Sequence, residues 1–129
     1  VLRSAVYLIL TKTPGRSLLG PKLVDTNILF LRRWNTGYED GRLTLPAGHI
    51  EKRETVACAA VREAKEELGV DVRKEDVEVL HTMHRPSGAD LVYVDFYVWV
   101  DSWKGAVYNA EPEKCNELIF ESLETLEST

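Results

Sequence analysis

The apolar residues in the first part of the chain form short runs, and turn-forming residues lie between these runs. Residues 1–11 are rich in β-branched and aromatic side chains, which predicts a strand. The Thr-Pro-Gly sequence at 13–15 predicts the turn after it. Residues 27–33 predict a second strand, and residues 43–45 predict a short third strand that Pro46 ends.

A change from strand-like to helical spacing follows. We expect a loop that begins at Ala47 and Gly48 and leads to a helix over residues 54–68. Gly69 comes just after this helix, where a left-handed residue commonly ends a helix. Apolar residues recur at helical spacing and make one face of the helix: Val56, Ala57, Ala60, Val61, Ala64 and Leu68.

Strand-like patterns return in the second half. Residues 77–85 and 91–100 predict two strands joined by a hairpin turn at 86–88, and Phe120 with its neighbours predicts a last short strand. Strands around at least one helix give an α/β or α+β sandwich. A sheet with two apolar faces needs a second helix, so we expect the natural chain to continue beyond residue 129. The chain starts with Val rather than Met, so we also expect residues to have been trimmed from its start.

The composition is that of one globular domain spanning residues 1–129, with 44% apolar and 29% charged residues. The longest apolar run, at 91–100, contains Asp95 and is too short to cross a bilayer, and the N-terminus shows no signal-peptide pattern. Cys58 and Cys115 lie outside any CxxC or Cys/His pattern. We therefore expect a cytoplasmic protein with two reduced thiols, no zinc and no membrane partner.

The net charge of −5, without a long basic block, disfavours nucleic acid as a partner, because such binding needs positive charge along phosphates. A small phosphorylated substrate is compatible with this charge if cations hold it.

The predicted helix carries Glu63, Glu66 and Glu67 on one face, because they are spaced i, i+3 and i+4. Like charges at this spacing cost a helix about 0.2–0.5 kcal/mol. One explanation is a solvated surface, eased by Arg62 and Lys65. The other is a Mg²⁺ site, since Mg²⁺ is commonly held by a few carboxylates together with substrate phosphates.

The flanking residues decide in favour of the metal. The segment 48–70 resembles the signature of the Nudix hydrolase family, Gly-x5-Glu-x7-Arg-Glu-U-x-Glu-Glu-x-Gly-U, in which U is a bulky aliphatic residue. The departure is Ala64, which is small where the family has a larger aliphatic residue, although that face is apolar either way. The matching residues are Gly48, Glu54, Arg62, Glu63, Glu66, Glu67, Gly69 and Val70.

The resemblance implies a Nudix α/β/α sandwich with a mixed β-sheet and a Mg²⁺-dependent enzyme, with Mn²⁺ as a substitute. It implies that Glu66 and Glu67 are the principal metal ligands and that Glu63 is a ligand or the base that activates water. The main-chain carbonyl of Ala47 is a further expected ligand. Glu54 is expected to pair with Arg62, which orients Glu63, and Gly48 is expected to let the loop approach the helix closely.

Candidates outside the signature are less constrained. Glu111 lies in a Glu-Pro-x-Lys-Cys segment seen in Nudix proteins and is either a further metal ligand or base, or part of a solvated turn. Arg33 ends the second strand and resembles a family position that reaches substrate phosphates, which a guanidinium can bind through two donors. Arg32 should face the other side of the strand. His49 follows the motif glycine and either contacts phosphate or is exposed.

The polar loop at 34–42 contains Trp34, Asn35 and Tyr38. These residues either stack on and hydrogen-bond a nucleobase or, as is commoner, pack the loop. His81 and His84 differ by three on a strand and therefore face opposite sides, so they make no metal pair. We expect Trp99 and Trp103 to be core or edge residues.

The resemblance leaves three functions open. The first, a MutT-like activity, hydrolyses a nucleoside triphosphate to the monophosphate and pyrophosphate. The second hydrolyses ADP-ribose or a nucleotide sugar, for which Pro86 offers weak support, and the third is a non-catalytic nucleotide-sensing module. The intact carboxylates favour an enzyme that acts on a small-molecule nucleotide. We expect it to be a monomer or a homodimer.

Overall fold

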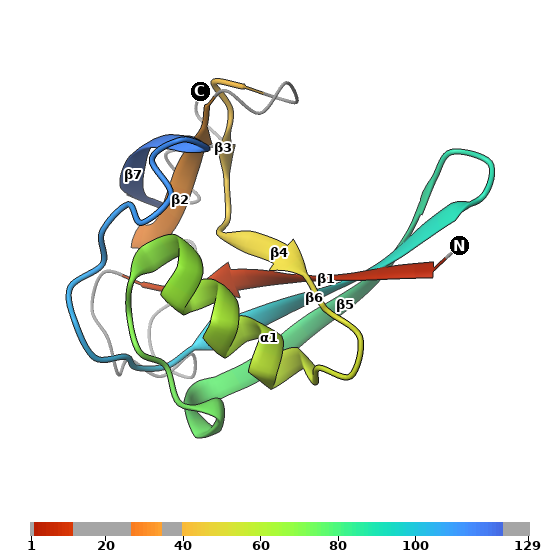
Figure 1. Ribbon diagram of the computed structural model, residues 1–129, viewed down its shortest axis with the longest axis horizontal. Coiled ribbons are helices and arrows are strands. Elements are labelled where there is room, and N and C mark those ends of the chain that lie inside the picture. The colour runs from red at the N-terminus through yellow and green to blue at the C-terminus, as the bar shows by residue number, and fades with distance from the viewer. Residues whose placement is uncertain (1, 12–26, 35–39, 123–129) are drawn as a thin grey trace.

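The computed structural model describes residues 2–11, 27–34 and 40–122, and Figure 1 shows their arrangement. A four-stranded sheet has the order β4-β1-β6-β5, and a three-stranded sheet has the order β3-β2-β7. The strands are β1 (Leu2–Ile9), β2 (Asn27–Arg33), β3 (Leu43–Thr44), β4 (Ala47–His49), β5 (Val77–Ser87), β6 (Leu91–Val100) and β7 (Cys115–Ser122). The helical elements are α1 (Val56–Glu63), the π-helical turn η2 (Ala64–Leu68) and the 3₁₀ turn η3 (Lys74–Asp76).

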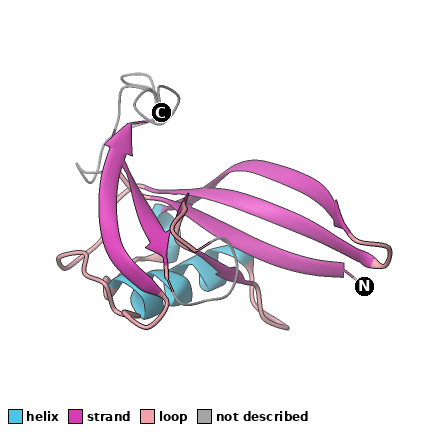
Figure 2. Ribbon diagram, turned by 90° about the horizontal axis from the view of Figure 1, so that it is seen from above, coloured by secondary structure: helices cyan, strands magenta, loops and turns pink. Residues whose placement is uncertain are grey.

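The larger sheet is mixed, because β1 runs parallel to β6 while its other pairings are antiparallel. Figure 2 shows the helix along one face of this sheet and the smaller sheet standing across it. The α/β class with a mixed sheet is therefore confirmed. The described part of the chain contains one α-helix, so the second helical layer of the expected sandwich is not seen there. No helix in the described ranges is long and apolar enough to cross a membrane.

Alternation along β1 divides the core between two clusters. Val6 and Leu8 are fully buried and belong to the cluster that includes Ala60 and Leu68 of the helical segment. Ile9 points to the other face and packs in a second cluster with residues of β2 and with Trp99, which is 4% exposed. The expected core position of Trp99 is confirmed, and Trp103 packs partly buried against the first cluster.

The predicted strands are largely confirmed, with β2 at its expected bounds. Two predictions were wrong. Ala47 and Gly48 do not begin a loop, because they form β4 and pair with β1. The hairpin turn does not begin at Pro86, because Pro86 and Ser87 still pair with β6 and the turn follows them. The predicted turn at 13–15 lies outside the described residues.

The predicted helix is correct in position, but it changes character along its length. Thr55 caps it, and its hydroxyl accepts a hydrogen bond from the Cys58 N–H at 3.1 Å. From Ala64 onward the helix widens to a π-helical turn, a form that periodicity does not reveal. Gly69 ends it in the left-handed region with φ of 70°, as predicted.

Replacing Gly69 with Ala is expected to destabilise the protein by about 1–2 kcal/mol, the typical cost of a left-handed conformation for a residue with a Cβ. The new Cβ would also lie 1.9 Å from the ring of Tyr108, but that side chain is 58% exposed and can move. Urea denaturation should show a lower free energy of unfolding. Most of this decrease should also appear when Gly69→Ala is made in a Tyr108→Ala background, where the ring is absent. A variant as stable as the wild type would contradict the backbone explanation.

Candidate active site

Glu63 lies at the junction of α1 and η2, directly beneath β4. Its side chain is largely buried and faces Gly48, where an added Cβ would lie 2.0 Å from Glu63 Oε1. No side chain larger than hydrogen therefore fits at Gly48 while Glu63 keeps this position. The need for glycine is a close approach, since the backbone of Gly48 is not in the left-handed region.

Arg62 holds this junction together through all of its guanidinium nitrogens. Nε and Nη2 donate to the two carboxylate oxygens of Glu54 at 2.8 and 3.0 Å, which is a bidentate pair. Nη2 also donates to the His49 carbonyl at 2.8 Å, and Nη1 donates to Glu63 Oε1 at 2.7 Å and to Glu66 Oε2 at 3.2 Å. Its hydrogen bonds hold the pKa of Glu54 below its usual value. Arg62 thus ties α1 to the end of β4.

Replacing Arg62 with Lys is expected to lower kcat by about 10–100-fold, the range found for residues that orient metal ligands. Lysine keeps the charge but loses the planar fork that reaches Glu54 and Glu63 together. If Arg62 acts by position, adding Glu54→Gln to Arg62→Lys should cost little more than Arg62→Lys alone. Additive losses in this double-mutant cycle would show that the two residues act separately.

Glu67 is the most strongly perturbed carboxyl group of the site. Burial and the neighbouring carboxylates of Glu63 and Glu111 raise its pKa to about 8, while the Ala47 N–H donates to Glu67 Oε2 at 3.2 Å. Burial also raises the pKa of Glu63, and the contact with Arg62 partly offsets this effect. Perturbed carboxyl groups that converge in a cleft are typical of a functional site.

The loop that carries Glu111 is hydrogen-bonded to the end of the helical segment. The N–H groups of Tyr108 and Ala110 donate to the carbonyls of Leu68 and Glu67 at 3.0 and 3.1 Å. Asn109 fixes the loop from within, because its Nδ2 donates to the Cys115 carbonyl at 2.6 Å and its Oδ1 accepts from the Glu111 N–H at 3.2 Å. The sequence analysis missed Asn109, although it stands next to the segment that singled out Glu111.

These groups line one cleft of about 1080 Å³ between the two sheets. Charges of both signs line it, and Lys114 pairs with Glu111 at 3.9 Å. The carboxylates are those of Glu63, Glu66, Glu67 and Glu111, and the cationic side chains are those of Arg33, Arg42, Arg85 and Lys114. Arg33 and Arg32 diverge as predicted, since Arg32 lies outside the cleft and pairs with Glu117. The cleft contains most of the predicted site residues: Arg33, Ala47, Gly48, His49, Glu63, Glu66, Glu67 and Glu111.

The remaining predicted residues lie elsewhere. Glu54 and Arg62 are behind the cleft wall rather than on it. Trp34 is 51% exposed and does not line the cleft. Asn35 and Tyr38 lie outside the described residues.

The donor set suits a hard divalent cation. Several carboxylates face one cleft, and Mg²⁺ is usually held by one or two of these together with substrate phosphates rather than by a closed protein cage. In the described part of the chain, no three His, Cys, Asp or Glu side chains are arranged as a ready-made metal site.

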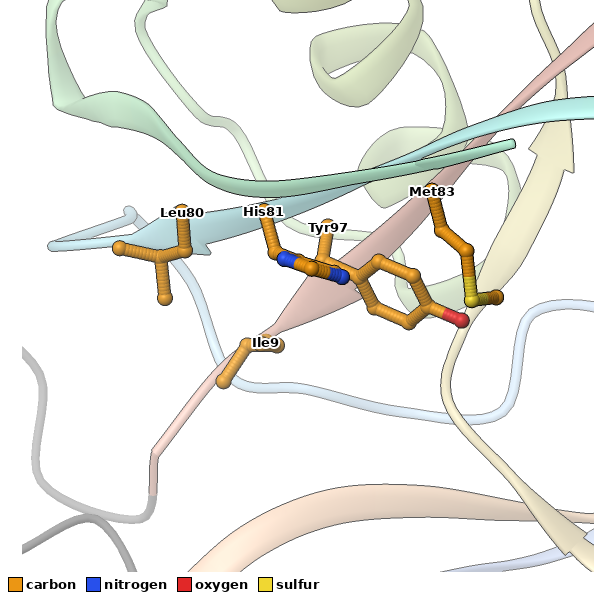
Figure 3. A pocket seen from close by; sticks show the side chains of 5 residues that line it. All are labelled: Ile9, Leu80, His81, Met83 and Tyr97. Atoms are coloured by element: carbon orange, nitrogen blue, oxygen red, sulfur yellow. The ribbon is translucent and has the colours of Figure 1, made fainter.

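A second, smaller cavity of about 300 Å³ opens on the face of the larger sheet opposite the helix. Figure 3 shows its lining residues, Ile9, Leu80, His81, Met83 and Tyr97. Its surface is almost entirely apolar, and no charged carboxylate, Arg or Lys side chain of the described residues lines it. His81 faces this cavity, and His84 is on the other side of β5, as expected.

Comparison with known proteins agrees with this geometry. The sequence profile of the NUDIX domain matches residues 2–128. The chain belongs to the Nudix hydrolase family. It is an enzyme of the Nudix pyrophosphohydrolase type, and the family acts on nucleoside diphosphates linked to a further group. A comparison with curated proteins gave no match.

Solved Nudix structures share the fold. A MutT NUDIX hydrolase from Burkholderia pseudomallei has a TM-score of 0.76 and 22% identity, over 96% of this chain and 85% of that one. The E. coli ORF135 protein has a TM-score of 0.73 and 22% identity, over 96% and 76%. The MutT protein from Methanosarcina mazei Go1 has a TM-score of 0.73 and 16% identity, over 99% and 82%. At identities this low, the similarity to these structures supports the fold of the chain and nothing finer.

Proposed function

We propose that this Nudix enzyme hydrolyses a nucleoside triphosphate to the monophosphate and pyrophosphate with Mg²⁺ as its cofactor. The observation that carries this proposal is the presence of four carboxylates and four cationic side chains in one cleft. The cationic side chains suit the phosphate oxygens, and the carboxylates suit the ion that must accompany them into a protein of net charge −5. Solved structures described as MutT proteins share the fold and support this direction.

The proposed metal ligands are Glu66 and Glu67, with the carbonyl of Ala47, and of the two roles expected for Glu63 we propose that of the base. Glu111 is the additional candidate, because its loop is hydrogen-bonded to the backbone of Glu67. A bound Mg²⁺ supplies neutralisation of the diphosphate oxygens and a lower pKa for a bound water. Mn²⁺ should substitute, since it also prefers carboxylate and water ligands.

The chain's own side chains bind and orient the substrate. Arg33, Arg42 and Lys114 line the cleft, and we assign them to the substrate phosphates. We assign the base to Glu63: its Oε1 accepts from Arg62, which fixes the carboxylate, and its Oε2 is the oxygen that takes the proton of water. Pro86 lies in β5 opposite Val92 and does not line the cleft, so it gives no support for an ADP-ribose substrate.

The test is a panel of nucleoside triphosphates, ADP-ribose and nucleotide sugars incubated with Mg²⁺, with products identified by ³¹P NMR in ¹⁸O-labelled water. The proposal expects triphosphates to be turned over fastest and to give monophosphate and pyrophosphate, with the label showing which phosphorus water attacked. Release of inorganic phosphate instead, or faster cleavage of ADP-ribose, would reject this substrate assignment.

A further inference from the structure

Arg85 and Asp95 form an ion pair in the cleft that the proposed catalysis does not use. They lie on the β5–β6 hairpin, and Arg85 Nε donates to Asp95 Oδ2 at 2.8 Å. The Asp95 side chain is completely buried, whereas Arg85 is 40% exposed and lines the cleft. The pair therefore presents one charged group to a ligand and hides the other beneath it.

The burial of Asp95 needs an explanation. Its Oδ1 is buried and has no hydrogen-bond partner among the described residues. Burying a carboxylate costs several kcal/mol, and a well-packed apolar residue is often as stable or more stable at such a position. A role in core packing alone therefore does not account for an aspartate here, and the group that Asp95 serves is the one it touches, Arg85.

Arg85 is held in a fixed orientation by three neighbours. Asp95 binds Nε, the Tyr93 ring lies 4.3 Å from the guanidinium carbon, and the Tyr7 hydroxyl lies beside the same group. Nε is occupied by the carboxylate, so the edge that carries the two Nη groups is the edge with further N–H donors. A guanidinium fixed in this way is a rigid, donor-only surface.

The sheet register sets this surface apart from the metal end of the cleft. Asp95 pairs with Ala5, and Ala5 pairs with His49, the neighbour of Gly48. Two strand spacings separate them, or about 10 Å. The ribose and first phosphate of a nucleotide span a distance of this order. Arg85 itself lies on β5, one strand beyond Asp95, but its guanidinium reaches back to the Asp95 carboxylate at 2.8 Å. A nucleotide with its phosphates near Gly48 would thus extend its base toward this guanidinium.

We propose that Arg85 reads the nucleobase of the substrate and that Asp95 is the positioning residue that fixes its guanidinium. The inference rests on the nucleotide substrate proposed above. The two Nη groups donate to adjacent acceptors, as O6 and N7 of guanine provide, whereas adenine offers a donor at N6. Phosphate is the less suitable ligand here, because Arg33, Arg42 and Lys114 already provide cations elsewhere in the cleft.

The experiment compares GTP with ATP in Asp95→Asn and Arg85→Lys. Asp95→Asn keeps the volume but loses the charge that fixes Arg85, and Arg85→Lys loses the planar fork. The wild type should prefer GTP, and each variant should raise KM for GTP about tenfold with little change in KM for ATP. The kcat for GTP should stay within about twofold, because neither residue touches the reacting atoms.

The matched control is Asp76→Asn, which breaks the Arg73–Asp76 pair, formed by the same Nε-to-carboxylate bond at 3.0 Å but away from the cleft. It should leave the GTP preference unchanged. Thermal denaturation reports whether each variant folds. If Asp95→Asn does not fold, the comparison of GTP with ATP is made with Arg85→Lys alone. Binding of GMP and AMP in EDTA gives a readout without catalysis, and the wild type should bind GMP more tightly.

Three results would overturn the inference. The wild type could show no preference for guanine, or the variants could raise KM for ATP as much as KM for GTP. The third is that the variants weaken inhibition by inorganic tripolyphosphate as much as they weaken GTP binding. The last two would assign Arg85 to the phosphates. A wild type that hydrolyses no triphosphate would instead reject the proposed function, while the GMP–AMP comparison would still test the reading of the base by Arg85.

Discussion

Replacing Glu67 with Gln is expected to lower the Mg²⁺-dependent kcat by at least about a hundredfold without unfolding the protein. Residues that merely orient metal ligands contribute about 10–100-fold, so the loss of a ligand should exceed that range. Gln has the same shape, and its amide oxygen can still accept the Ala47 N–H that Glu67 Oε2 accepts at 3.2 Å. Steady-state kinetics with a Mg²⁺ titration measures the loss.

Thermal denaturation in EDTA separates this effect from damage to the fold. Burial raises the pKa of Glu67 to about 8, which means that the charged carboxylate is unfavourable in the metal-free protein. The Gln variant should therefore melt at the same temperature as the wild type or higher. Adding Mg²⁺ should raise the melting temperature of the wild type more than that of the variant. Activity close to that of the wild type would reject Glu67 as a ligand.

Replacing Gly48 with Ala is expected to lower kcat by about a hundredfold through displacement of Glu63. The added Cβ would lie 2.0 Å from Glu63 Oε1, so the carboxylate must leave its place beside Arg62. Because Gly48 does not have a positive φ, the substitution brings no backbone strain of its own. The expected result is an enzyme that folds nearly as well as the wild type and turns over poorly.

Gly88→Ala gives the opposite pattern and serves as the control. Gly88 has φ of 76° and no heavy atom within 4 Å of an added Cβ, so alanine there should cost about 1–2 kcal/mol of stability through backbone strain. Its activity should be unchanged at temperatures where it is folded. If Gly48→Ala loses stability and keeps activity, the close approach of Gly48 to Glu63 has no catalytic role.

Much of this geometry could be predicted because the signature fixes spacing along one helix. Arg62 and Glu66 are spaced i, i+4, so the helix alone brings their side chains together, whereas Glu54 precedes the helix and was linked to Arg62 through the signature. The strand β2 was predicted at its correct bounds because its apolar run ends in two arginines. Local patterns succeed where local structure decides the contacts.

The missed features depend on contacts between distant segments. A three-residue strand such as β4 has no period to detect, and it exists because β1 offers it an edge. The widening at η2 coincides with carbonyl contacts to the loop at 108–110, which no helical pattern records. Asp95 was visible as a charge inside an apolar strand, but only the register with β5 brings Arg85 to it. A buried charge in such a strand is the signal that could have located this end of the cleft.

The place of β1 inside the larger sheet also has a consequence for how the enzyme is made. Leu2 pairs with Val92, so β1 finds its parallel partner only after the whole segment between the two strands has been synthesised. Such long-range pairing is slow to form and leaves apolar edges exposed meanwhile. Glu63 lies against β4 and Arg85 lies on β5, so these two parts of the cleft are on opposite sides of β1. A nascent or truncated chain that ends before β6 therefore carries the complete glutamate signature and no assembled cleft, and catalytic competence arrives with the last strands rather than with the motif.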